Sequence, residues 1–176
     1  DPAALDVTGL RRALDRYHLQ VSAVGTGQAY VEEGLSFTHD ESGVRQRALF
    51  RIKSHIALAR ELNALLIIGL IRGKIGGDAQ QARTRLVNAL TSAARTASEY
   101  GVRIAIEPIN RYETNMLNNV AETLALIETL EADNVGILFD TFHANIEEAS
   151  IETSLRACGA RLFHVHLADS NRWHPG

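Results

Sequence analysis

The chain has 176 residues, 45% of them hydrophobic and 22% charged, which is enough for one globular domain with a substantial core. The formal net charge of −3 gives no general attraction to a polyanion, and no local basic patch offsets it, so nucleic acid is disfavoured as a partner. The longest apolar run, residues 64–71, is too short to cross a bilayer, and we expect neither a membrane segment nor a targeting leader.

A leading helix, expected over about residues 2–18, precedes five short apolar runs that each predict a strand. These runs cover residues 19–24, 64–71, 102–109, 135–140 and 161–169. Between them, apolar residues recur every three or four positions, which predicts amphipathic helices. The recurring positions are Val44, Ala48, Ile52, Ile56 and Ala59, then Leu86, Leu90, Ala93 and Ala97, then Val120, Leu124, Ile127 and Leu130.

Two pairs of polar residues have the spacing of a capping box, which marks the start of a helix. Asn119 with Glu122 begins the third of these helices, and Asn145 with Glu148 precedes a shorter one. The single cysteine, Cys158, follows in an amphipathic stretch, so we interpret it as a core residue rather than a nucleophile. A chain without a disulfide fits a reducing cytoplasm.

Strands that are apolar on both faces and separated by helices imply a parallel sheet, and therefore the α/β class. An open doubly wound sheet and a closed barrel both fit this pattern. Residues 24–34 contain the glycines of a nucleotide-binding turn, but we expect no helix directly behind them, which favours a (β/α)8 TIM barrel. An eight-stranded barrel needs about 250 residues. We therefore expect residues 1–176 to form a single partial TIM-barrel domain of five strands with their helices, with about three strands missing and both sheet edges unpaired.

Metal-ligand side chains stand where the last three predicted strands end, namely Glu107, Asp140 and His166. In a parallel barrel these strand ends converge on one mouth. Two carboxylates and an imidazole, without a thiolate, suit Mn²⁺, Mg²⁺, Co²⁺ or, less well, Zn²⁺. Any one of the carboxylates could instead cap a helix or pair with an arginine, but three consecutive strands ending this way point to one divalent-metal site.

Other polar residues near the strand ends have simpler interpretations. His164 has the strand parity of His166 but lies one layer deeper, which indicates a hydrogen-bonded core histidine. Arg72 and Lys74 could hold an anionic group of a substrate, although a solvated turn is the preferred interpretation. Three histidines in helical or loop segments are interpreted as solvated or packed: His18, His39 and His55.

Three motifs carry a family resemblance: EPINRYE at 107–113, FDTFHANIEE at 139–148 and FHVHLADSNRWHPG at 163–176. They resemble, in order and position, the ketose 3-epimerase branch of the sugar phosphate isomerase/epimerase superfamily, which has the xylose isomerase-like TIM barrel fold. D-tagatose and D-psicose 3-epimerases typify this branch. The resemblance extends more loosely over nearly the whole chain, and it implies that the five strands are about strands 3 to 7 of the barrel.

The resemblance implies that Glu107, Asp140 and His166 bind one divalent metal ion, with Mn²⁺ favoured, and that Glu107 also acts as an acid/base carboxylate. It implies a small-molecule ketose or related sugar as the partner, and it favours a homo-oligomer, as do the unpaired sheet edges. The residues implied to contact the sugar are Glu113, His143 and Arg172.

This implied activity agrees with the chemistry of the site. Inverting a carbon next to a ketone needs a positive centre for the developing enediolate and one base on each face of the substrate. Glu107 can be one base, whereas the family's second base, a glutamate on the eighth strand that is also the fourth metal ligand, lies outside these 176 residues. We therefore expect the segment alone to hold metal weakly and to be inactive, and a parent protein to complete the barrel.

Three alternative functions remain open at this point. An aldose–ketose isomerase, hydroxypyruvate isomerase or inosose dehydratase would use similar ligands, and Arg72 would be the first candidate to bind a phosphate on the sugar. An apurinic endonuclease-like metallonuclease would need a three-zinc cluster with histidines on earlier strands, and residues 24–30 and 69–74 contain none. The third alternative is a sugar-binding barrel without catalysis.

Overall fold

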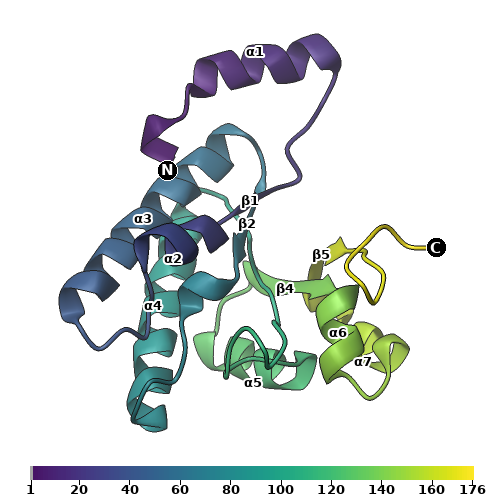
Figure 1. Cartoon of the computed structure of the whole chain (residues 1–176). Coiled ribbons are helices and arrows are strands. Elements are labelled where there is room, and N and C mark those ends of the chain that lie inside the picture. The colour runs from purple at the N-terminus through teal and green to yellow at the C-terminus, as the bar shows by residue number, and fades with distance from the viewer. Residues whose placement is uncertain (1) are drawn as a thin grey trace.

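The structure, a computed structural model, describes residues 2–176, in which five strands form one sheet in chain order (Figure 1). All neighbouring strands pair in parallel. The strands are β1 (Ala23–Gly25), β2 (Leu65–Ile68), β3 (Ile104–Ile106), β4 (Val135–Asp140) and β5 (Leu162–His166). The α-helices are α1 (Val7–Tyr17), α2 (Gly27–Glu33), α3 (Ser42–Glu61), α4 (Ala79–Glu99), α5 (Val120–Leu130), α6 (Thr141–Glu147) and α7 (Ile151–Cys158), with short 3₁₀ turns η1 (Pro2–Ala4), η2 (Leu70–Arg72) and η3 (Gly159–Arg161). Across these residues, no helix combines the length and apolar character that a membrane span requires.

The α/β class is confirmed, and the strand order separates the two architectures. A doubly wound sheet reverses its strand order at a switch point, whereas here each crossover adds the next strand on the same side. Helices α2 to α7 follow one another around the sheet, whereas α1 lies apart from it (Figure 1), and α2 to α7 contribute to the core on the face that carries residues such as Leu66, Ile104 and Ile137. The opposite face carries a smaller apolar cluster that includes Ala105 and Leu138. This arrangement is half of a barrel, with β1 and β5 as its edges.

The predicted helix faces are the ones that are buried. All the recurring apolar positions of α3 and α4 are buried, and so are those of α5 except Leu124, which is half-buried. Asn119 caps α5 as expected, because its side chain accepts a hydrogen bond from the backbone N–H of Glu122. Each fully buried leucine or isoleucine contributes about 1.5–3 kcal/mol of hydrophobic free energy, so these faces hold the helices to the sheet.

Three local expectations differ from the structure. Helix α2 does begin directly behind the glycine-containing turn, with Thr26 before its first residue, and Gly34 ends it in the left-handed region with φ 65°. The chosen Asn145–Glu148 pair does not start a helix, because Asn145 lies inside α6 and the hydroxyl of Ser150 caps α7. The barrel assignment therefore rests on strand order and not on a missing helix. The leading helix is shorter than expected, since residues 2–4 form the separate turn η1.

The ladder between β4 and β5 contains an irregularity. Ile137 pairs with Leu162, but the next residue, Leu138, pairs with His164, so Phe163 is an extra residue in β5. Gly136 allows this, because a Cβ there would lie 2.5 Å from the carbonyl oxygen of Arg161 and 2.6 Å from the Phe163 ring. Beyond the irregularity, Asp140 pairs with His166.

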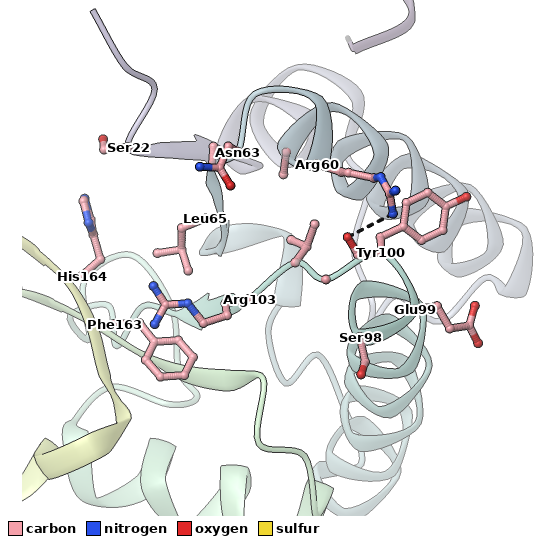
Figure 2. Close-up of a pocket in the computed structure, with 14 residues that line it drawn as sticks. Ser22, Arg60, Asn63, Leu65, Ser98, Glu99, Tyr100, Arg103, Phe163 and His164 are labelled. Carbon is pink, nitrogen blue, oxygen red and sulfur yellow. Dashed lines mark hydrogen bonds between the residues drawn. The ribbon is translucent and has the colours of Figure 1, made fainter.

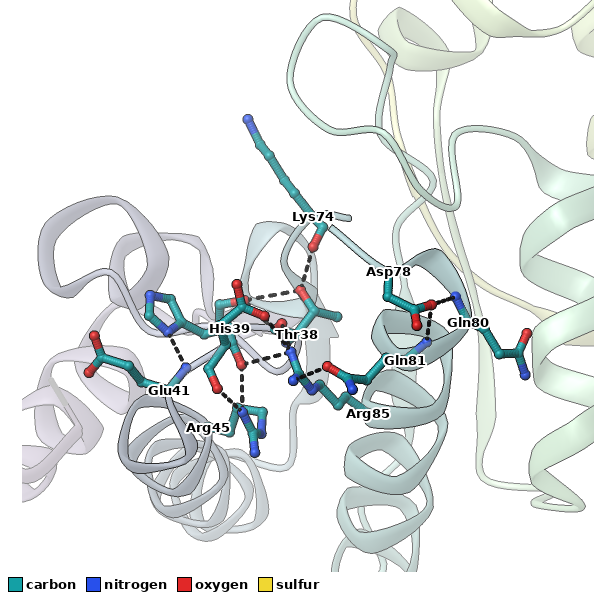
Figure 3. A network of polar contacts seen from close by, with 11 residues as sticks. Thr38, His39, Glu41, Arg45, Lys74, Asp78, Gln80, Gln81 and Arg85 are labelled. Carbon is teal, nitrogen blue, oxygen red and sulfur yellow. Dashed lines mark hydrogen bonds and ion pairs between the residues drawn. The ribbon is translucent and has the colours of Figure 1, made fainter. Parts of the chain in front are cut away.

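A polar network fastens the loop before α3 to α4 (Figure 3). Arg85 donates to the backbone carbonyls of Thr38 and His39 and forms an ion pair with Asp40 at 2.8 Å. Arg45 donates to the carbonyls of His39 and Asp40, both at 2.7 Å. The same loop packs on η2, because the N–H of Phe37 donates to the Ile71 carbonyl. The network thereby fixes η2 beside the carboxyl ends of the strands.

The expectations for three histidines and for the single cysteine hold. His18 is exposed at the end of α1, whereas His39 is half-buried and accepts a hydrogen bond from the Glu41 N–H. His55 is a buried residue of α3, and its ring contacts the carbonyl of Arg51 one turn earlier in the same helix. Cys158 is a buried core residue, and burial raises the pKa of its thiol to about 11.

Candidate metal and active site

Strand parity directs three ligand-type side chains to the face of the sheet that turns away from the helices. Ala105 and Leu138 belong to the apolar cluster on that face, and Glu107 and Asp140 each follow two residues later. His166 is the ladder partner of Asp140 and ends β5. The carboxyl ends of β3, β4 and β5 therefore carry Glu107, Asp140 and His166 to one place.

The geometry of these three residues fits a divalent cation. Their ligand atoms all lie within 4.8 Å of one another. The Nδ1 atom of His166 is 3.7 Å from Oε1 of Glu107 and 3.7 Å from Oδ2 of Asp140. Two ligand atoms that each bind a cation at about 2.1 Å lie at most about 4 Å apart, so these separations leave room for a shared ion.

The charges of the site also favour a cation. Within residues 2–176, the ion pairs of Glu107 and Asp140 are with His166 alone, and their side chains are only 14% and 7% exposed. Two neighbouring carboxylates with little access to water need a positive partner. The pKa of His166 is raised, first because Glu107 can accept a hydrogen bond from the ring and then through the charges of Glu107 and Asp140, while burial opposes the rise.

Asp140 combines two roles that the sequence presented as alternatives. Its Oδ1 accepts a hydrogen bond of 2.8 Å from the backbone N–H of Phe142 and so caps α6. Its Oδ2 is the oxygen that faces His166. The cap fixes the carboxylate and thereby aims the second oxygen into the site.

Arg72 is not part of a solvated turn, and that expectation is wrong. The side chain is 0% exposed and its guanidinium donates to the backbone carbonyls of Gly69, Glu107, Met116 and Leu117. Burial lowers its pKa to about 10, so it remains a cation at neutral pH. A guanidinium that is saturated by carbonyls and closed to solvent has no donor left for a substrate phosphate. The sequence contained one indication that Arg72 is buried: it is the one charged residue inside the apolar run GLIRG.

Lys74, in contrast, is exposed as expected. Arg72 instead fastens both ends of the 107–117 loop, through the carbonyl of Glu107 at 2.8 Å and the carbonyl of Leu117 at 3.2 Å. The ion pair of Arg111 with Glu147 ties the same loop to α6, and the backbone N–H of Arg111 donates to Glu147 at 2.6 Å. The segment that carries Glu107 is therefore held at several points.

The three residues expected to contact a sugar lie together, around a fourth residue that sequence reasoning missed. Glu113 Oε1 accepts hydrogen bonds from Nδ2 of Asn110 and from Nη1 of Arg172, both at 3.2 Å. Nδ2 of Asn110 also lies 2.8 Å from Nδ1 of His143. Asn110 is 2% exposed. The sequence offered only one indication of its role, namely an amide residue among the charged residues of the EPINRYE motif.

His143 connects this second group to the metal-ligand trio. It is 2% exposed, and burial lowers its pKa, while the charges of Asp140, Glu107 and Glu113 act in the opposite direction. Carboxylates of both groups thus act on the same imidazole, which places all of them in one site. The histidine is neutral at neutral pH.

Arg172 lies in a tight turn after β5. Its φ of 66° is in the left-handed region, and its N–H donates to the Asp169 carbonyl. The guanidinium stacks 4.6 Å from the centre of the Phe142 ring, a cation–π contact. Phe142 is the residue whose N–H binds Asp140, so α6 positions the arginine as well as the carboxylate.

His164 does not behave as predicted, because it has no hydrogen-bond partner among the described residues and is only half-buried. It lines a cavity of about 660 Å³ at the amino ends of β1 to β3, together with Arg103 and Phe163 (Figure 2). Its ring meets His166 edge-on, with centroids 5.2 Å apart. The prediction that His164 points to the same face of the sheet as His166 was correct. The prediction that it is buried was wrong, because the sheet is open on this face. The cavity lies at the opposite strand ends from the three ligands.

Comparison with known proteins assigns the family. All 176 residues match the family described as xylose isomerase-like TIM barrel. An L-ribulose 3-epimerase of Mesorhizobium japonicum is 31% identical over 98% of this chain and 58% of its own length. A D-psicose 3-epimerase of Enterocloster bolteae is 39% identical over 58% of this chain and 34% of its own. The solved structure of D-allulose 3-epimerase from Methylomonas sp. in complex with D-allulose superposes with a TM-score of 0.85 and 29% identity, covering 98% of this chain and 60% of that one.

The chain spans between 58% and 62% of the length of the relatives that it matches almost end to end. The family match confirms the TIM barrel fold expected from the strand pattern, and the open five-stranded sheet is consistent with part of such a barrel. On this match, and on the epimerase relatives aligned along its length, the chain belongs to the xylose isomerase-like TIM barrel family.

Proposed function

We propose that this chain supplies most of the active site of a metal-dependent sugar epimerase that inverts a ketose at C3. The observation that carries the proposal is the convergence of Glu107, Asp140 and His166 within 4.8 Å beside a second polar group suited to a sugar. Relatives named as ketose 3-epimerases, similar along nearly the whole chain, support it.

In this proposal Glu107, Asp140 and His166 hold one divalent ion, with Mn²⁺ favoured and Mg²⁺, Co²⁺ or Zn²⁺ as alternatives. The set of oxygen and imidazole donors, without a thiolate, fits these ions. When bound, the cation would stabilise negative charge that develops on a substrate oxygen.

The protein's own residues would bind the sugar and move its proton. A carboxylate oxygen of Glu107 would take the proton from the carbon beside the carbonyl, or return it. Glu113, His143 and Arg172 would contact the hydroxyl and carbonyl oxygens, with Arg172 and His143 as donors. Because Arg72 and the Arg111–Glu147 pair hold the loop that carries Glu107 and Glu113, these carboxylates need little reorganisation.

We further propose that residues 1–176 act as a single partial-barrel domain and that the complete protein supplies a second base and a fourth ligand. The edges of β1 and β5 would pair with further strands there, and surfaces left open would favour a homo-oligomer.

The test is carried out on the intact protein that contains this chain. With a ketose substrate, Mn²⁺ and D₂O, an epimerase incorporates deuterium at C3 of substrate and product, and we expect one bound metal per active site. Glu107→Gln should reduce exchange by at least about 100-fold, the size of a general-base contribution. Glu128→Gln, an exposed residue of α5, is the matched control and should change nothing.

Other outcomes would overturn this proposal in distinguishable ways. Label at C1 instead of C3 would indicate an aldose–ketose isomerase. Three zinc ions per chain would indicate a metallonuclease. Sugar binding with no label at any carbon would indicate a barrel that binds but does not catalyse.

A further inference from the structure

We propose that Asn110 fixes His143 in the neutral tautomer that carries its proton on Nε2, so that His143 offers the substrate a hydrogen-bond donor and cannot act as a base. This makes Asn110 a positioning residue. The inference rests on the proposed function for its role toward a sugar, but the tautomer itself does not depend on any activity.

Two donors converge on one nitrogen of the His143 ring. The backbone N–H of Asn110 donates to Nδ1 at 3.4 Å, and the side-chain Nδ2 of the same residue lies 2.8 Å from it. A backbone N–H can only donate, so Nδ1 must present its lone pair. In a neutral imidazole the proton is then on Nε2.

The orientation of the Asn110 amide is fixed independently of the histidine. Its Oδ1 accepts from the backbone N–H of Tyr112 at 3.0 Å, which only an oxygen can do. Its Nδ2 reaches Oε1 of Glu113 at 3.2 Å, and a carboxylate there needs a donor. Exchanging the amide oxygen and nitrogen would place oxygen against oxygen at Glu113 and hydrogen against hydrogen at Tyr112. The donor that faces Nδ1 is therefore the nitrogen.

The other ring nitrogen is left for a ligand. Nε2 of His143 has no hydrogen-bond partner among residues 2–176, and no side-chain nitrogen or oxygen in that range is both fully buried and without a partner. Nε2 therefore keeps some solvent-accessible surface, although the residue as a whole is 2% exposed. A buried ring with one accessible N–H presents that donor in a single direction.

The same amide also determines what Glu113 can do. Oε1 of Glu113 is occupied by Asn110 and Arg172, which leaves Oε2 as the free acceptor. The site then offers one donor at His143, one acceptor at Glu113 and the remaining donors of Arg172. This pattern matches a ligand with a hydroxyl beside a second oxygen that only accepts, as in the hydroxy-ketone portion of a ketose.

Nitrogen-15 NMR of the full chain, with imidazole-labelled histidine and diamagnetic Mg²⁺, measures the tautomer directly. We expect the His143 signals, assigned by their loss in His143→Gln, to show an unprotonated Nδ1 and a protonated Nε2. In Asn110→Asp a carboxylate oxygen replaces the amide nitrogen that lies 2.8 Å from Nδ1, and this shorter, charged contact should outweigh the 3.4 Å contact with the retained backbone N–H, so the proton should shift to Nδ1.

Asn118→Asp is the matched control. Asn118 lies in the same loop, where its Nδ2 donates to the carbonyls of Ile109 and Thr114 and does not contact His143. It should loosen the loop and leave the tautomer unchanged. A protonated Nδ1 in the unsubstituted chain, or the same tautomer in Asn110→Asp as in Asn118→Asp with both chains folded by circular dichroism, would overturn the inference.

The inference and the proposed function can fail separately. Deuterium incorporation by the intact protein with a protonated Nδ1 would sink the tautomer assignment and leave the epimerase. An unprotonated Nδ1 without deuterium incorporation would overturn the epimerase proposal and leave the tautomer assignment in place.

Discussion

Gly69 lies against the carboxylate of Glu107, so closely that a Cβ at position 69 would come within 3.1 Å of Oε2. The same Cβ would lie 3.5 Å from Cδ1 of Ile109, an ordinary van der Waals contact, so the carboxylate is the group that would have to move. Glycine at this position therefore leaves the space in which Glu107 faces the other two ligands.

We expect Gly69→Ala to displace the Glu107 carboxylate by a few tenths of an ångström and to weaken Mn²⁺ binding by about 10-fold to 100-fold, as for other changes just outside a metal site. Titration calorimetry measures the affinity. Gly76→Ala is the control, because a Cβ there meets nothing within 4 Å. Equal affinities for the two variants would contradict this account of Gly69.

Metal binding should release a proton from His166. The raised pKa lies above the ordinary 6.5, so the ring is partly protonated at neutral pH and must lose that proton to bind a cation. Affinity should fall as the pH decreases through this raised pKa. Calorimetry in two buffers of different ionisation enthalpy gives the number of protons released, and a value of zero at pH 6.5 would contradict the prediction.

The raised pKa of His166 has the opposite pH dependence in its effect on the stability of the metal-free chain. A raised folded-state pKa means that protonated His166 stabilises the fold, fully below pH 6.5, and that this contribution is lost as the pH rises through the raised pKa. Urea unfolding with a chelator present, compared between the unsubstituted chain and His166→Gln, isolates the effect. The difference in unfolding free energy should shrink as the pH rises.

Arg72→Met should destabilise the chain by at least about 3 kcal/mol, because it leaves four buried carbonyl groups without their charged donor. Urea unfolding measures the loss. Lys74→Met, two residues away and exposed, should stay within about 0.5 kcal/mol of the unsubstituted chain. A similar small change in both variants would show that the guanidinium does not hold this loop.

Cys158 should resist thiol reagents in the folded chain. The thiol is buried, and its pKa of about 11 leaves little thiolate at pH 8. Labelling should therefore be slow in buffer and complete within the mixing time in strong denaturant. Rapid labelling of the native chain would mean that α7 opens readily.

The strand ends were predictable because two simple periodicities determine them. Alternation along a strand and the common direction of parallel strands are enough to bring positions 107, 140 and 166 together, without any knowledge of loops. The buried faces of α3 and α4 follow in the same way from helical spacing. Each of these inferences needs only the residue type at one position and its place in the repeat of its own strand or helix.

The missed features depend on partners that are distant in sequence. Arg72 is buried because carbonyls 35 to 45 residues away receive its hydrogen bonds, and Asn110 matters because His143 lies 33 residues away. No local pattern contains this information. The start of α2 was missed for a different reason, since glycine at a first helical position hides a boundary that favourable residues behind it determine.

The irregular pairing between β4 and β5 selects the chemistry of the site. Had the register of Ile137 with Leu162 continued unbroken, Asp140 would stand opposite Val165, and an isopropyl group would take the position that the imidazole has. The single additional residue at Phe163, tolerated beside Gly136, places an imidazole in this position instead of a hydrocarbon side chain. A regular ladder formed by the same sequence would therefore preserve the sheet and leave the two carboxylates without the imidazole.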